Sequence, residues 1–71
     1  MRGEAIRSGG TASILLSNLQ AALCAWPSRR WASPEDQVRS ITRFAQSIGF
    51  EYLSQTTKNG QQFCNFWMMP A

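Results

Sequence analysis

The sequence predicts a small α+β domain in which two helices pack on a C-terminal antiparallel β-hairpin. Apolar residues recur every three or four positions in two stretches between residues 11 and 48, as they do on one face of a helix. Two later aromatic-rich runs flank Lys58-Asn59-Gly60, and Asn-Gly between such runs is a strong hairpin signal. A chain of 71 residues with 44% hydrophobic and 15% charged content is expected to fold around one small core.

The N-terminal residues 1–10 are predicted to form a flexible arm, because they lack periodicity and end in a glycine pair. Residues 11–71 are expected to form the single domain. Arg2 and Arg7 on the arm could reach a phosphate backbone, although an ordinary frayed terminus is the simpler interpretation. The arm contains no signal-peptide pattern and no apolar run approaches a membrane span, so we expect a cytoplasmic protein without membrane contact.

The first helix is predicted to begin near Thr11 and to end at Pro27, with Thr11 or Ser13 as the N-cap. Its apolar positions recur at helical spacing: Leu15, Leu19, Ala22, Leu23 and Trp26.

The second helix has the clearest boundaries. Ser33 is a good N-cap, Pro34 fits the first helical position, and the acidic residues that follow complement the helix dipole. Gly49 suits the left-handed residue that closes a helix. The inward stripe is expected to be Val38, Ile41, Phe44, Ala45 and Ile48.

The hairpin is predicted to pair Phe50 to Thr56 with Gln62 to Met69, in a register that the sequence leaves open. A two-residue turn groups Phe50, Tyr52, Phe63, Trp67 and Met69 on one face, whereas a three-residue loop with a bulge groups Phe50, Tyr52, Cys64, Phe66 and Met68. In both cases aromatic side chains lie on both faces. The predicted core is Leu15, Leu19, Leu23, Val38, Ile41, Phe44, Ile48 and Leu53.

Basic residues indicate a polyanionic or acidic partner. The chain has six arginines and one lysine against four carboxylates, so its net charge is +3. Arginine is the better residue for bidentate contact with phosphate or guanine. Arg39, Arg43 and Gln46 are expected on the outer side of the second helix. Arg29 and Arg30 lie in the connector before Trp31, where they could hold phosphates while the tryptophan either contacts a partner or joins the core.

Catalytic and metal-binding residue types are scarce. The chain has no histidine, and Cys24 and Cys64 are 40 residues apart, so neither a zinc site nor a Cys-His nucleophile can be assembled. We therefore expect a protein that is not an enzyme and binds no cofactor or metal. The cysteines are interpreted as buried and reduced, with one disulfide as the alternative.

The segment Val38 to Tyr52, the Asn59-Gly60 turn and Phe66-Trp67-Met68 together resemble the end of a compact winged helix-turn-helix domain of the phage or plasmid regulator kind. In that family a helix leads into a two-stranded wing. The resemblance implies DNA binding in transcription regulation, with Arg39, Arg43 and Gln46 facing the major groove. It also implies that Lys58 and Asn59 at the wing tip contact the backbone or the minor groove.

Two other interpretations remain open. The stretch Ile41 to Phe66 is similar to the small HicA-type toxins, which implies an RNA-binding scaffold, but Gln61 and Gln62 stand where those nucleases need a histidine. Alternatively, the chain is a small protein-binding inhibitor or adaptor of the phage anti-defence type, directed at an acidic or nucleic-acid-binding protein. Trp31 and Trp67, with the arginines, would then contact the partner. The small core also makes a homodimer plausible.

Overall fold

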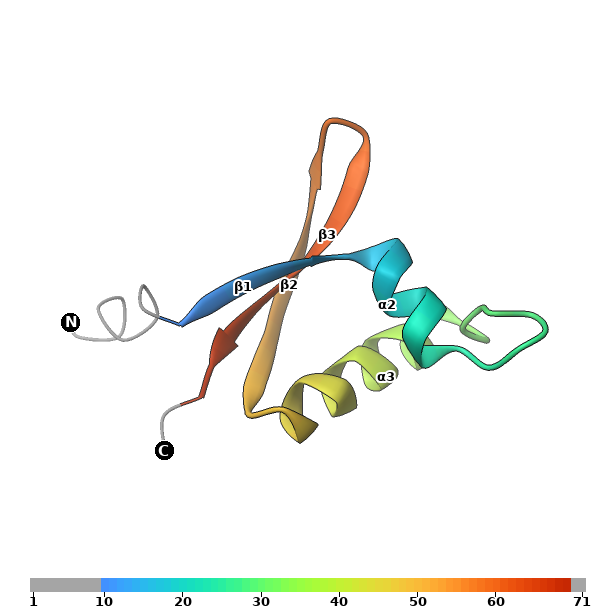
Figure 1. Cartoon of the computed structure of the whole chain (residues 1–71), viewed down its shortest axis with the longest axis horizontal. Helices are drawn as coiled ribbons and strands as arrows, with labels where there is room; N and C mark the ends of the chain where they lie inside the picture. Colours follow the sequence, from blue (N-terminus) through green and yellow to red (C-terminus); the bar gives the residue numbers. More distant parts are fainter. Residues whose placement is uncertain (1–9, 70–71) are drawn as a thin grey trace.

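The computed structural model describes residues 10–69, which run in the order β-α-α-β-β (Figure 1). The elements are β1 (Thr11–Leu15), α2 (Leu16–Leu23), α3 (Pro34–Ser47), β2 (Phe50–Lys58) and β3 (Gln61–Met68). The three strands form one antiparallel sheet in the order β1-β3-β2. The α+β class, the two helices and the C-terminal hairpin are therefore confirmed. The predicted arm lies almost entirely outside the described residues.

The start of the predicted first helix is wrong, because Thr11–Leu15 is a strand. Its register on β3 runs from Thr11 opposite Trp67 to Leu15 opposite Phe63. Pairing with a central strand satisfies backbone groups that a helix would otherwise satisfy locally, and tertiary context of this kind overrides helix periodicity. The helix α2 begins only at Leu16, has no side-chain cap, and ends at Leu23 before Trp26 and Pro27.

The second predicted helix is confirmed at both ends. The Asp36 backbone N–H donates to Ser33 Oγ at 3.1 Å, and Pro34 occupies the first turn. Gly49 follows the helix with a φ of +81°, which a residue with a Cβ adopts only with strain.

The hairpin combines one feature from each predicted register. Lys58 pairs with Gln61, so Asn59 and Gly60 form a two-residue turn, with φ values of 54° and 78° that fit type I′. A β-bulge between Tyr52 and Ser54 then shifts the pairing by one residue. As a result Phe50, Tyr52, Cys64, Phe66 and Met68 share a face, which is the grouping expected for the longer loop.

The core lies between this face and the two helices. Its buried residues are Leu19, Ile41, Ala45, Cys64 and Phe66. The rings of Phe44 and Tyr52 flank the Phe66 ring, with centroids 6.4 Å and 5.5 Å from it. Both helices therefore cover the same side of the sheet.

Four residues of the predicted core do not join it. Val38 and Ile48 are 50% and 49% exposed, and Ile48 is the C-cap of α3. Leu53 is the extra residue of the bulge and is also exposed. Leu15 is half-buried on the opposite face of the sheet, whose alternation the strand sets.

On the second face of the sheet, side-chain hydrogen bonds connect all three strands. Ser13 Oγ donates to Asn65 Oδ1 at 2.8 Å, and Asn65 Nδ2 donates to Ser54 Oγ at 3.4 Å and to Thr56 Oγ1 at 3.3 Å. No helix within residues 10–69 covers this face. These bonds fix the side chain of the central strand against both of its neighbours.

The N-cap of α3 provides a first test. Replacing Ser33 by Ala removes the acceptor for the Asp36 N–H, so we expect the free energy of unfolding to fall by about 1 kcal/mol in urea denaturation followed by circular dichroism. Ser28→Ala in the exposed connector is the matched control and should change it little. Equal losses in the two variants would contradict the capping role.

Candidate nucleic-acid interface

The outer side of α3 carries the polar residues predicted for the major groove. Residues along an α-helix are 100° apart, so Arg39, Arg43 and Gln46 fall within about 60° of one another. That stripe is opposite Ile41 and Ala45, which are buried against the sheet. All three polar side chains are exposed, and α3 can present them without losing core contacts.

One of the two arginines on this stripe already has an acidic neighbour. Arg39 Nη1 lies 3.2 Å from Asp36 Oδ1, and the second oxygen of Asp36 accepts from the Ala32 N–H at 3.0 Å. Because both side chains of the ion pair are well exposed, the pair contributes at most about 1 kcal/mol and can reorganise around a ligand. Arg43 has no ionic partner among the described residues.

The connector between the helices is held in place by α2. Gln20 Nε2 donates to the Arg29 carbonyl at 2.8 Å, and the Arg29 N–H donates to the Ala25 carbonyl at 3.0 Å. Arg29 has a φ of 54°, a left-handed conformation that non-glycine residues adopt rarely. The backbone that carries Arg29 and Arg30 is thus positioned by specific contacts, and both arginines are exposed.

Trp31 is partly buried and packs against the core, which is the core interpretation of this residue. Its indole N–H is buried and has no hydrogen-bond acceptor among the described atoms. Arg30, Ser33 and Gln37 line, together with Trp31, an open groove of about 470 Å³ where the connector enters α3.

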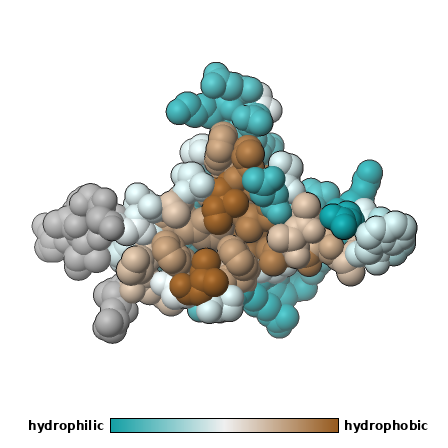
Figure 2. Space-filling view, viewed as in Figure 1, coloured by the Kyte–Doolittle hydropathy of each residue, from teal (hydrophilic) through white to brown (hydrophobic). Residues whose placement is uncertain are grey.

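The hairpin tip and α3 are not brought together. Figure 1 shows the β2-β3 turn projecting away from α3. Lys58 and Asn59 at this tip are exposed. Figure 2 shows hydrophilic residues at the tip and around α3, separated by a hydrophobic band across the middle of the molecule. The predicted helix and wing contacts therefore lie on separate surfaces.

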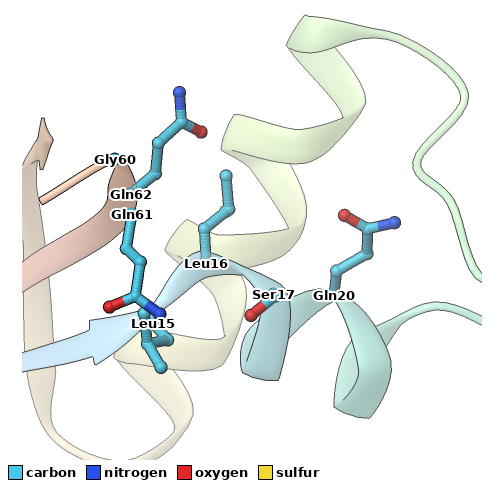
Figure 3. Close-up of a pocket in the computed structure, with 7 residues that line it drawn as sticks. All are labelled: Leu15, Leu16, Ser17, Gln20, Gly60, Gln61 and Gln62. Carbon is cyan, nitrogen blue, oxygen red and sulfur yellow. The ribbon is translucent and has the colours of Figure 1, made fainter.

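A shallow pocket of about 360 Å³ lies between the start of α2 and the hairpin tip (Figure 3). It is lined by Leu15, Leu16, Ser17, Gln20, Gly60, Gln61 and Gln62. The amide and hydroxyl groups can donate and accept hydrogen bonds, but the lining contains no charge to attract phosphate and no acid or base.

The tryptophans are distributed differently from the sequence prediction. Trp67 is partly buried on the second face of the sheet, where its indole N–H donates to Glu51 Oε1. Trp26, which the helical pattern placed on the apolar face of the first helix, is instead 75% exposed in the connector. Its position just before Pro27, where a helix cannot continue, was the available sequence signal.

Two titratable groups in or against the core have shifted pKa values. Burial raises the pKa of the Cys64 thiol and of the Tyr52 hydroxyl. Both cysteines are free thiols. Among residues 10–69, no three His, Cys, Asp or Glu side chains gather where they could hold a metal ion.

Neither described helix is long and apolar enough to cross a membrane. No protein-family model matches the chain, and no curated protein or solved structure is significantly similar to it.

The buried thiol predicts how stability depends on pH. Since the folded pKa of Cys64 lies above its ordinary value of 9.0, the unfolded chain loses this proton first, and the free energy of unfolding should fall as pH rises above about 9. Urea denaturation at pH 7 to 10 should show a shallower decline for Cys64→Ala. The control Phe66→Leu perturbs the same core without removing a titrating group and should keep the original slope. An unchanged slope in Cys64→Ala would contradict this origin.

Proposed function

We propose that this chain is a cytoplasmic, non-enzymatic DNA-binding or regulatory module that reads duplex DNA with the outer face of α3. The observation that carries the proposal is the exposed stripe of Arg39, Arg43 and Gln46 opposite the buried Ile41 and Ala45. An α-helix with its side chains is 10–12 Å across, and the major groove of B-DNA is about 12 Å wide.

Each polar residue on the stripe has a distinct role in this proposal. A guanidinium can donate to guanine O6 and N7 together, and a glutamine amide can donate to and accept from adenine. Arg43, which has no ionic partner among the described residues, is the first candidate for base contact. Arg39 would share its guanidinium between DNA and Asp36, which remains anchored by the Ala32 N–H.

The connector supplies phosphate contacts beside the reading helix. Arg29 and Arg30 precede α3, on backbone that Gln20 holds, and rigidly placed arginines fix the register of a protein on the duplex. Residues 24–33 form a connection longer than the three or four residues of a standard helix-turn-helix. The longer connection provides these arginines, and α3 acts as the reading element on its own.

The hairpin tip contributes a separate contact. Because the β2-β3 turn points away from α3, Lys58 and Asn59 would touch a phosphate outside the segment that α3 reads (Figure 1). The α3 stripe and the tip can therefore be tested independently.

The decisive experiment measures affinity for mixed-sequence duplex DNA by fluorescence anisotropy between about 50 and 200 mM salt. Replacing Arg39 and Arg43 together by Ala should weaken binding at least tenfold and make the slope of log affinity against log salt shallower, since two positive charges are removed from the reading surface. Lys58→Ala at the hairpin tip should reduce the slope by about 1 at most.

The double replacement by Lys is the matched control for charge. It retains both positive charges but loses bidentate geometry, so it should keep most of the nonspecific affinity and lose sequence preference. Wild-type affinity in a folded Ala double variant would remove α3 from the interface. No binding at the lowest salt would remove the DNA proposal itself.

A second candidate function is a protein-binding inhibitor or adaptor, which the exposure of Trp26 favours. A tryptophan that is 75% exposed in a connector also bearing Arg29 and Arg30 has the composition of an interface hot spot. Trp26→Ser should change the free energy of unfolding by less than about 0.5 kcal/mol. If this function is correct, the variant should lose a partner that the wild-type chain recovers, and Arg39→Ala/Arg43→Ala should still recover it. Recovery by the folded Trp26→Ser chain would exclude this surface.

A further inference from the structure

The outer edge of β1 presents unpaired backbone groups. The Met68 N–H donates to the Gly10 carbonyl at 2.6 Å, so Gly10 and Met68 form a hydrogen-bonded pair of the antiparallel ladder. Hydrogen-bonded pairs alternate along a strand, which turns the backbone groups of Ala12 and Ile14 toward β3. The groups of Thr11, Ser13 and Leu15 therefore point outward. Apart from the Leu15 carbonyl at the start of α2, they have no partner among the described residues.

The two edges of the sheet differ in how they are protected. On β2, the bulge between Tyr52 and Ser54 interrupts the edge, and Glu51 and Lys58 place charges on it. On β1, the sequence Thr-Ala-Ser-Ile-Leu has no charge, no proline and no bulge. Bulges and charges are the common devices that prevent strands from pairing edge to edge, so only β2 is blocked.

We propose that β1 pairs antiparallel with β1 of a second copy of this chain, with Ser13 on the two-fold axis. Ser13 is the middle residue of the five-residue strand. Its outward N–H donates to the carbonyl of the partner's Ser13, and its own carbonyl accepts from the N–H of that residue. The Leu15 N–H then donates to the carbonyl of the partner's Thr11. By symmetry, the N–H of the partner's Leu15 donates to the Thr11 carbonyl. The three-stranded sheets become one continuous six-stranded sheet.

Side-chain chemistry favours an identical strand as the occupant. On the helix-covered face, the exposed Ala12 lies opposite the half-buried Ile14 of the partner subunit, which extends the apolar layer. On the other face, Thr11 lies opposite the partner's Leu15. Although each chain carries a net charge of +3, no charged side chain belongs to either strand, so pairing brings no like charges into contact at the junction. The interface is thus neutral and self-complementary.

The pairing is independent of DNA binding. The α3 stripe is on the outer side of its helix, whereas β1 is at the sheet edge, so dimerisation should occur without nucleic acid and should survive Arg39→Ala/Arg43→Ala. Failure of either proposal leaves the other testable.

The test is the mass of the full chain by sedimentation equilibrium at concentrations from micromolar to about 1 mM. The wild type should approach twice the chain mass of 8.0 kDa. Ser13→Pro removes the outward N–H without removing a bond to β3, and proline is tolerated at such edge positions, so this variant should stay folded and sediment as a monomer. Ser13→Ala loses the same Oγ–Asn65 bond but keeps the N–H, and should remain dimeric.

Charge reversal at the two-fold axis provides a second test that does not depend on how well proline is accommodated. Ser13→Lys and Ser13→Asp should each be monomeric, because like charges would be brought together across the axis. An equimolar mixture should recover the dimer mass. A monomeric wild type over the whole range, or a dimer that persists in folded Ser13→Pro, would overturn the proposal. A mixture that remains monomeric while Ser13→Pro remains dimeric would do so as well.

Discussion

The packing of β3 against the helices is the constraint on which the rest of the described structure depends. This strand pairs on both of its edges, and its inward residues Cys64 and Phe66 are among the few fully buried side chains. Ile41 and Ala45 of α3 and Leu19 of α2 close over them. Because the core holds so few buried residues, contacts with this strand make up a large part of it, as expected for a domain of this size.

The bulge in β2 makes a tight hairpin turn compatible with the packing of Tyr52 against Phe66. A type I′ turn at Asn59-Gly60 is a favoured hairpin connection, but an unbroken register from that turn would place Phe66 on the face opposite Tyr52. The extra residue Leu53 restores Tyr52 and Phe66 to the same face, where their rings pack. The cost is an exposed leucine, and the gain is a disrupted edge that resists further pairing.

The sequence predicts well those features that depend on residues close together in the chain. The limits of α3 follow from Ser33, Pro34 and Gly49, and the outward stripe follows from the 100° rotation per residue. Thr11–Leu15 could not be assigned this way, because the partner that makes it a strand lies 52 residues away, as in the bond from Ser13 to Asn65. The same limit applies to the site: no local signal shows that the hairpin points away from α3, or that Trp31 packs against the core.

The two proposed surfaces, the α3 stripe and the β1 edge, would strengthen one another, because a dimer would present two α3 stripes to the same DNA. A single α3 stripe offers DNA two arginines, and Asp36 partly offsets the charge of one, so one copy makes few strong contacts. A two-fold axis through Ser13 would present a second α3 on the same rigid sheet and convert the second binding event into an intramolecular one. The DNA counterpart of such a protein is a palindromic pair of half-sites whose spacing is set by the distance between the two helices. Edge pairing of β1 would in this way determine not only the oligomer but also the symmetry of the sequence that α3 reads.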